Sequence, residues 1–341
     1  MATGTAVGVR FGRRLLAHVE IWRLDTVFYI GPVTLSGALF AGGGHGTGWR
    51  VAAAWLAPTL GWVASLYGGD YFDRELDAVA KPGRPIPSGR MSPRTAFAGM
   101  VMTIVAGTVI AAALNPRNLV LVVASTVMGV LYAKVFKARG LAGNLIRGGP
   151  TAAAFALGTM AVRALPPWPV IVLGLIFWLH DSASNLVGTI CDREGDREGG
   201  YRTIPVLRGD ASALRTLIVL DLLWIVAAVA APAVFPARAG LRSYYSLLAV
   251  AIVLTFVSAA MLLRAPRPIP RVRALPAHEV IVIERLILAC GFLAAAANLG
   301  LAFAVGVPAV LATFGARFVM RQRDHPSLAR RWFRNRSTVR S

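Results

Sequence analysis

Long apolar runs alternate with short charged segments along most of the chain. Each run approaches the ~20 residues that an α-helix needs to cross the hydrocarbon core of a bilayer. The runs lie at 24–42, 50–67, 95–114, 118–136, 143–163, 168–190, 213–235, 242–263 and 281–305. This pattern predicts an all-α polytopic membrane protein, a bundle of nine transmembrane helices, and leaves the apolar stretch 307–320 unassigned.

The charged loops divide into two sets. The loops around 74–94, 134–139, 193–208 and 264–273 hold most of the basic residues, and the loops between them hold few. Because membrane proteins concentrate Lys and Arg in cytoplasmic loops, we expect the first set and the N-terminus in the cytoplasm. Nine spans would then place the C-terminal tail outside, although it carries six arginines between 321 and 336. Either 307–320 returns through the membrane or the tail breaks the rule.

Composition supports a membrane protein and changes the interpretation of the charge. Apolar residues make up 56% of the 341 residues and charged residues only 15%, whereas soluble domains carry about 25% charged residues. A net charge of +20 would suggest nucleic acid in a soluble protein, but basic cytoplasmic loops account for it here, so we expect no nucleic-acid partner. We expect a cytoplasmic segment at 1–22, a transmembrane domain at 23–305, and an extra membrane segment with a basic tail at 306–341.

Two of the basic loops repeat one another. Asp-Arg-Glu-x-Asp occurs at 73–77 and again at 192–196, and Arg-x-Ile-Pro follows at 84–87 and 202–205. The four predicted spans between them return both loops to the same membrane face, so they can converge on one site. An internal repeat of this kind suggests two related halves that face each other.

The repeated carboxylates favour a metal–diphosphate site. A spacing of four places both carboxylates of a pair on one face of a helix. Four such groups repel one another unless cations lie between them, and Mg²⁺ combines carboxylates with phosphate oxygens. Nearby basic side chains suit the remaining phosphate charge: Lys81, Arg84, Lys137 and Arg202. For either box alone, solvated loop charges are an equal alternative.

Polar residues also enter the predicted spans. Asp181, Asn185, Gly188 and Asp192 recur at helical spacing in the sixth span and form a stripe that leads to the second box. Ionisable residues inside membrane helices usually face an interior cavity. Further polar intrusions could equally hold helices together or line the site: Arg23, Asp25, Arg147, Glu284, Arg285 and Asn298.

These motifs carry a family resemblance. Residues 70–77, followed by Lys81–Gly89, resemble the first signature of the UbiA superfamily of intramembrane prenyltransferases. Residues 192–196, followed by Gly200–Gly209, resemble the second signature, and Tyr132–Asn144 is similar to the family's Tyr-x-x-x-x-Lys…Gly-x-x-Gly-Asn segment. The resemblance covers roughly residues 20–305.

The resemblance implies a helical bundle with a central cavity open to lipid. It implies Mg²⁺-dependent transfer of a prenyl group from an isoprenyl diphosphate to a hydrophobic, aromatic or quinone-precursor acceptor, in a prokaryotic cell membrane with the active site toward the cytoplasm. Motif matching assigns the metal to the aspartates: Asp70, Asp73, Asp77, Asp192 and Asp196. It assigns diphosphate binding to five basic residues: Lys81, Arg84, Lys134, Lys137 and Arg202. It places two further residues in the reaction region: Tyr132 and Asn185.

The chain departs from the family pattern at one position, and four alternatives stay open. The family's first motif normally has Asn immediately before Asp70, where this chain has Gly69. Lys134 and Lys137 could simply anchor a span at the membrane surface. A terpene cyclase on the same scaffold would use the same boxes without an acceptor. A transporter also combines repeats with buried polar residues, and a lipid-binding scaffold would show no Mg²⁺ dependence.

Overall fold

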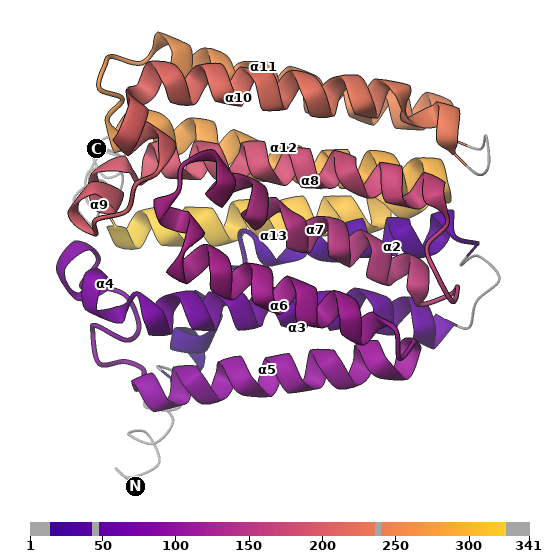
Figure 1. The fold of residues 1–341 in the computed structure, drawn as a ribbon, viewed down its shortest axis with the longest axis horizontal. Helices are drawn as coiled ribbons and strands as arrows, with labels where there is room; N and C mark the ends of the chain where they lie inside the picture. Colours follow the sequence, from indigo (N-terminus) through magenta and orange to yellow (C-terminus); the bar gives the residue numbers. More distant parts are fainter. Residues whose placement is uncertain (1–13, 43–47, 236–239, 325–341) are drawn as a thin grey trace, which may run out of the picture.

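The computed structural model describes residues 14–42, 48–235 and 240–324 as a bundle of long helices that lie side by side (Figure 1). Within these residues every regular element is helical, and ten helices have eleven or more residues. The long helices are α2 (Ile30–Phe40), α3 (Gly48–Phe72), α5 (Pro93–Leu114), α6 (Asn118–Lys134), α7 (Leu141–Met160), α8 (Trp168–Cys191), α10 (Ile204–Ala230), α11 (Leu241–Arg264), α12 (Arg271–Ala296) and α13 (Leu299–Asp324). The short elements are η1 (Val27–Tyr29), α4 (Arg74–Ala80), η3 (Phe136–Ala138), α9 (Arg193–Glu198) and η4 (Ala231–Val234).

Proline and hydroxyl residues set the starts of several helices. Pro93 is the first residue of α5, and the Ser92 hydroxyl accepts the Thr95 backbone N–H at 3.0 Å. Pro270 directly precedes α12, and Pro205 is the second residue of α10. Because the first turn of a helix has unpaired N–H groups, a missing N–H there costs nothing and a capping oxygen stabilises the helix.

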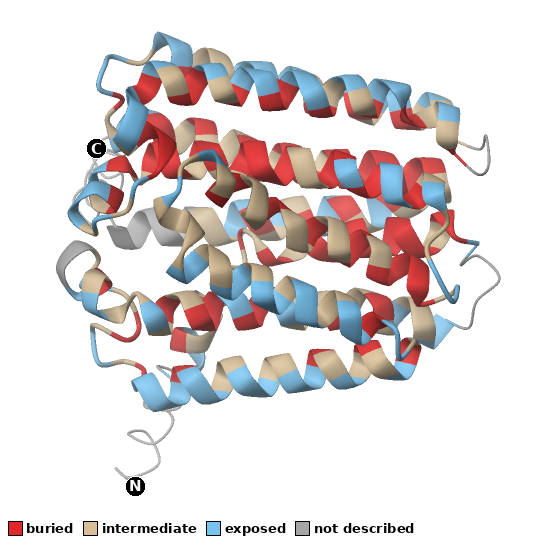
Figure 2. Cartoon of the chain, in the orientation of Figure 1, coloured by how far each residue is buried: buried red, intermediate tan, exposed pale blue. Residues whose placement is uncertain are grey.

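The outer helices present apolar side chains to the surroundings. Among the residues that the structure describes, six helices are long and apolar enough to cross a membrane: α3, α5, α8, α10 with η4, α11 and α13. Met102 on α5, Val120 on α6 and Val226 on α10 are 66–71% exposed, whereas most of α8 is buried (Figure 2). Large apolar areas on the outside are unfavourable in water and suit lipid. The chain is therefore a multi-pass integral membrane protein.

Glycines allow two inner helices to touch backbone to backbone. A Cβ on Gly158 of α7 would lie 1.9 Å from the carbonyl oxygen of Thr34 on α2, and a Cβ on Gly37 would lie 2.1 Å from that of Phe155. The Thr159 hydroxyl also donates to the Gly37 carbonyl at 3.0 Å. Small residues and interhelical hydrogen bonds are the usual means of packing helices in lipid. This contact fixes α7, which carries part of the site described below.

The ninth predicted span, 281–305, is wrong, because the structure breaks it into the end of α12 and the start of α13. Ala297 leaves the helical conformation (φ −131°, ψ −87°), and the Asn298 side chain accepts the Leu301 backbone N–H at 2.9 Å. Asn298 therefore starts a new helix. Hydropathy alone joins the two apolar runs because it does not register this cap.

The unassigned stretch 307–320 belongs to α13, which returns along α12. Arg317, near the end of α13, binds Asp25 at 3.1 Å and Glu279, in the first part of α12, at 3.6 Å. The two helices are thus antiparallel, and α13 ends where α12 begins. This agrees with the first of the two explanations for the basic tail; residues 325–341 lie outside the described part of the chain.

Candidate functional site

The two repeated sequence boxes fold into the same local structure at the same end of the bundle. Asp73 joins α3 to α4 and Asp192 joins α8 to α9, with nearly equal backbone angles (φ −87°, ψ 5° and φ −96°, ψ 10°). In each box the second aspartate donates its backbone N–H to the carbonyl of the first at 2.8 Å. Both short helices lie at one end of the molecule, which we call the acidic end (Figure 1). The predicted convergence of the two boxes on one side of the bundle is confirmed.

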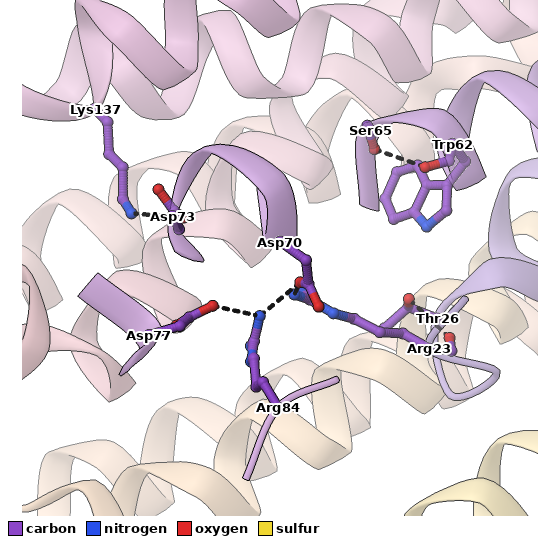
Figure 3. A network of polar contacts seen from close by, with 9 residues as sticks. All are labelled: Arg23, Thr26, Trp62, Ser65, Asp70, Asp73, Asp77, Arg84 and Lys137. Atoms are coloured by element: carbon purple, nitrogen blue, oxygen red, sulfur yellow. Dashed lines mark hydrogen bonds and ion pairs between the residues drawn. The ribbon is translucent and has the colours of Figure 1, made fainter. Parts of the chain in front are cut away.

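Arginine side chains hold the first box together. Arg84 Nη1 donates to Asp70 Oδ1 at 2.7 Å and to Asp77 Oδ2 at 3.2 Å (Figure 3). Arg23 Nη2 donates to the same Asp70 oxygen at 2.9 Å. Asp70 and Asp77 are both 4% exposed, so their charges need these cations. Burial raises the pKa of Asp77, and Arg84 acts against that shift.

Lys137 connects the two boxes. Its Nζ lies 4.0 Å from Asp73 Oδ2 in the first box and 3.8 Å from Asp196 Oδ1 in the second, and Figure 3 shows it beside Asp73. The same Nζ lies 3.9 Å from the centre of the Tyr201 ring, and the Tyr201 hydroxyl donates to Asp73 Oδ1 at 3.4 Å. Burial acts to lower the pKa of Lys137, but the attraction of Asp73 and Asp196 outweighs it and raises the pKa. A charged lysine therefore lies between carboxylates of both boxes.

The second box is fixed by other arginines. Arg271, at the start of α12, binds Asp192. Arg193 is 4% exposed and donates to both oxygens of Asp210 at 2.9 Å, while Asp210 also accepts the Ile269 backbone N–H at 2.6 Å. Arg193 thus anchors α9 to α10 and to the segment before α12.

The donor set of the boxes fits a hard divalent cation. Asp196 is 5% exposed, and its Oδ2 has no hydrogen-bond partner in the described residues. Burial raises the pKa of Asp196 to about 6, and Lys137 opposes that shift. A buried carboxylate oxygen without a donor is an unsatisfied ligand of the kind that Mg²⁺ takes. Across the residues described, no group of three or more His, Cys, Asp or Glu side chains is gathered closely enough to hold a metal, because basic side chains lie between the carboxylates.

An accessible stripe leads from the second box into the bundle. Between 180 and 193 every residue of α8 and its junction with α9 is buried except Asn185, Gly188 and Asp192, which are half-buried and spaced three or four apart. Asn144 on α7 donates to Asn185 Oδ1 at 2.9 Å. Three of the four positions of the polar stripe seen in the sequence are thus half-buried, whereas the fourth, Asp181, is buried.

The remaining predicted residues lie at the acidic end in different settings. Burial lowers the pKa of Lys81, and the charge of Asp192 opposes that shift. Lys134 is exposed, 5.8 Å from the Phe72 ring, and Tyr132 is half-buried near enough to Lys137 to act on its charge. The Arg202 side chain is exposed, and its backbone carbonyl accepts the Gly140 N–H at 3.0 Å. The backbone of Arg202 therefore connects the loop after the second box to the loop that begins α7. No described contact joins the Arg202 side chain to either box.

Three contacts at the site were not predicted from the sequence. No sequence pattern distinguishes Arg271 from the other basic residues of its loop, and none pairs Tyr201 with Asp73. Arg23 was recognised only as a polar intrusion, and its partner Asp70 is 47 residues away. A Cβ built on Gly69, the position where the family normally has Asn, meets no atom within 4 Å. That position therefore has room for a larger side chain.

Comparison with known proteins agrees with this geometry. The model of the UbiA prenyltransferase family matches residues 30–278. A digeranylgeranylglyceryl phosphate synthase of Halobacterium salinarum is 35% identical over 249 residues, which cover 71% of this chain and 86% of the relative. The enzyme of the same name from Thermococcus kodakarensis is 29% identical over 73% of this chain and 87% of its own.

Solved structures share the fold. The structure of a digeranylgeranylglyceryl phosphate synthase gives a TM-score of 0.63 at 23% identity and covers 83% of this chain and 98% of its own. The structure of a UbiA homologue from Archaeoglobus fulgidus bound to GPP and Mg²⁺ gives a TM-score of 0.62 at 15% identity. It covers 86% of this chain and 99% of its own. Paired acidic boxes at one end of a membrane-embedded helical bundle and the match over most of the chain lead to one conclusion: the chain belongs to the UbiA prenyltransferase family and is a prenyltransferase.

Proposed function

We propose that this prenyltransferase transfers a prenyl group from an isoprenyl diphosphate to a hydrophobic acceptor, with Mg²⁺ held by Asp73, Asp77, Asp192 and Asp196. The observation that carries the proposal is the placement of Lys137 between Asp73 and Asp196. It brings both carboxylate boxes within the span of one diphosphate. The Archaeoglobus fulgidus homologue bound to GPP and Mg²⁺ supports the same pairing of ligands.

The chain's own residues can bind the leaving group. Lys81, Arg84 and Lys137 are cations that now face carboxylates, and they can turn to the diphosphate when the carboxylates bind metal. When bound, Mg²⁺ neutralises the charge that grows on the leaving diphosphate. Charge-assisted hydrogen bonds from the three basic side chains stabilise the same charge.

The reaction balances without an oxidant or reductant. The bond between C1 of the prenyl group and the diphosphate oxygen breaks, and its electron pair leaves with the diphosphate. A nucleophilic atom of the acceptor forms a new bond to C1 and releases its proton. The half-buried face of α8 at Asn185 and Gly188 leads inward from the acidic end and can receive the prenyl group out of water.

The family resemblance implies a hydrophobic, aromatic or quinone-precursor acceptor. The names of the relatives instead refer to digeranylgeranylglyceryl phosphate, in which prenyl groups are carried by a glyceryl phosphate. We therefore propose a glyceryl phosphate lipid as the first acceptor to test, beside an aromatic one. The loops at the acidic end are also rich in Lys and Arg, which suggests that this end faces the cytoplasm.

The test is diphosphate release from isoprenyl diphosphates with Mg²⁺. Asp73→Asn and Asp192→Asn should each lower the rate by about 100-fold or more, because each removes a metal ligand. Glu75→Gln is the matched control, since Glu75 lies inside the first box but its side chain is 86% exposed and paired with Arg74. Normal turnover by either aspartate variant would refute the metal assignment.

Product analysis separates transfer from cyclisation. Incubation with the diphosphate and Mg²⁺ alone should yield no cyclic hydrocarbon or alcohol, and adding acceptor should yield a prenylated acceptor. A cyclic product formed without acceptor would instead identify a terpene cyclase.

A further inference from the structure

The guanidinium of Arg285 is buried in the bundle without an acid beside it. Arg285 lies on α12 and is 6% exposed, and its Nε and Nη2 have no acceptor among the described residues. The carboxylates of Asp181 and Asp25 act on its charge, but their salt bridges are to other arginines: Asp181 to Arg147 at 3.5 Å and Asp25 to Arg317 at 3.1 Å. Arginine stays charged when buried, and an unpaired buried charge is costly. The site therefore favours an anion.

The neighbours of Arg285 add further donors. Its Cζ lies 4.8 Å from the centre of the Tyr29 ring and 5.7 Å from that of Trp62, and Arg147 Cζ lies 4.9 Å from the same Trp62 ring. Trp62 Nε1 and the Tyr29 hydroxyl are also buried without a partner in the described part of the chain. We call Tyr29, Trp62, Arg147 and Arg285 the arginine cluster. It offers two guanidiniums, an indole N–H and a phenol, a set that suits a group with several negatively charged oxygens.

The arginine cluster is separate from the acidic end. Arg147 lies three residues after Asn144 on α7, just under one helical turn, and its partner Asp181 lies four residues before Asn185 on α8. The Arg147–Asp181 pair therefore joins α7 and α8 about one helical turn farther from the acidic end than the Asn144–Asn185 pair. From Asp192 to Asp181 the helix rises about 16 Å at 1.5 Å per residue. This separation leaves room for the reacting carbon between the proposed diphosphate site at the acidic end and the arginine cluster.

Building on the proposed prenyl transfer, we propose that the arginine cluster is a second anion site, which binds the phosphate of a phosphorylated lipid acceptor. The diphosphate and the acceptor phosphate would then be held at opposite ends of one reaction space. The acceptor hydroxyl is placed between them, toward Asn185. An uncharged aromatic acceptor would leave Arg285 without its countercharge and would bind more weakly.

The test compares acceptors and variants in the purified full-length protein. Initial rates of transfer are measured with a monoprenylglyceryl phosphate and with the same lipid lacking its phosphate. Arg285→Gln and Arg147→Gln should each raise the KM for the phosphorylated acceptor by about 10- to 100-fold, the usual effect of losing a hydrogen bond between charged groups, and leave the KM for the diphosphate unchanged. Arg285→Lys should recover part of the loss. Arg242→Gln is the control, because Arg242 is exposed at the start of α11.

A binding measurement gives a readout that does not depend on turnover. The phosphorylated acceptor should raise the melting temperature of the wild-type protein without Mg²⁺ or diphosphate, and should not raise that of Arg285→Gln. If Arg285→Gln fails to fold, Arg147→Gln and the comparison of the two acceptors in the wild type decide the question.

The outcomes separate this proposal from the proposed function. If wild-type protein transfers prenyl groups equally well to both acceptors, or if the variants raise the KM for the diphosphate instead, the acceptor site is refuted and prenyl transfer stands. If wild-type protein releases no diphosphate from any isoprenyl donor with Mg²⁺, the proposed function fails, whatever binds at the arginine cluster.

Discussion

Replacing Lys137 by Met tests how the two acidic boxes are joined. Lys137 Nζ lies 3.8 Å from Asp196 Oδ1 and 4.0 Å from Asp73 Oδ2, and its side chain is 20% exposed. The substitution keeps an unbranched side chain, one atom shorter, and removes its charge. Asp196 then loses the cation that opposes the effect of burial, so its pKa should rise above about 6. The variant also loses a cation that we assign to the diphosphate.

The size of the effect follows from the geometry. Two unit charges at this distance attract by about 4 kcal/mol at an effective dielectric constant of ~20, whereas exposed pairs contribute about 1 kcal/mol or less. Lys137 is partly exposed and lies between these limits, so we expect its attraction to Asp196 to contribute about 1–2 kcal/mol. Losing this attraction raises the pKa of Asp196 by about one unit. Loss of a charge-assisted contact to the diphosphate should raise the donor KM by about 10- to 100-fold.

The assay is the initial rate of diphosphate release against pH at Mg²⁺ below saturation. For the wild type the rate should fall below pH about 6, the pKa of Asp196, and for Lys137→Met the fall should begin about one pH unit higher. Lys137→Arg should resemble the wild type. Arg139→Gln is the control, since Arg139 is a nearby cation in the same loop and is exposed. A Lys137→Met variant with the wild-type pH profile and donor KM would refute the bridging role.

Four further predictions concern the metal, the departure at Gly69 and the fold. Because the raised pKa of Asp196 keeps its proton bound up to pH about 6, Mg²⁺ affinity measured by titration should fall about tenfold per pH unit below that value; constant affinity down to pH 5 would contradict this. Gly69→Asn should fold normally, because a Cβ at this position meets no atom within 4 Å, and should tighten the apparent Mg²⁺ affinity by about 2- to 10-fold. Weaker Mg²⁺ binding by this variant would contradict a role of position 69 beside the metal. Gly158→Ala should lower the melting temperature because its Cβ would lie 1.9 Å from the Thr34 carbonyl oxygen, whereas Gly129→Ala, with no atom within 4 Å, should not; equal melting temperatures would exclude the close helix contact. Asp210→Asn should destabilise the protein by about 3–5 kcal/mol by leaving Arg193 buried without its partner, as measured by thermal unfolding, and an unchanged melting temperature would show that this pair does not anchor α9.

The acidic boxes could be predicted because their signal is local. The spacing of Asp73 and Asp77, repeated at Asp192 and Asp196, is visible in a few residues, and an even number of intervening spans brings the copies to one face. The structure shows Asp73 and Asp192 at equivalent helix junctions. Their roles in metal binding stay predictions.

The partners of the boxes could not be predicted in the same way. Arg271 reaches Asp192 across 79 residues, and nothing in its sequence separates it from the other basic residues of that loop. Arg84 is close in sequence to Asp70 and Asp77, so its contacts with them could be expected. Arg202 occupies the equivalent position of the repeat, but its side chain is exposed. Pairing over long separations depends on helix packing, which hydropathy does not encode.

The helix boundary at Asn298 shows a different limit. An averaged apolar pattern joined 281–305 into one span because a single Asn does not lower the mean hydropathy of a window. Its side chain caps the Leu301 N–H, and Asn is a preferred N-cap residue. Weighing that cap signal against the apolar run would have placed α12 and α13 as separate helices.

Anomalous diffraction from protein crystals grown with Mn²⁺ and a non-hydrolysable isoprenyl diphosphate tests the central claim most directly. The account predicts metal density at the acidic end with ligands from both boxes, at least one carboxylate from 73–77 and one from 192–196, and the diphosphate beside Lys137. Metal bound by one box alone, or a diphosphate placed away from both boxes, would contradict it.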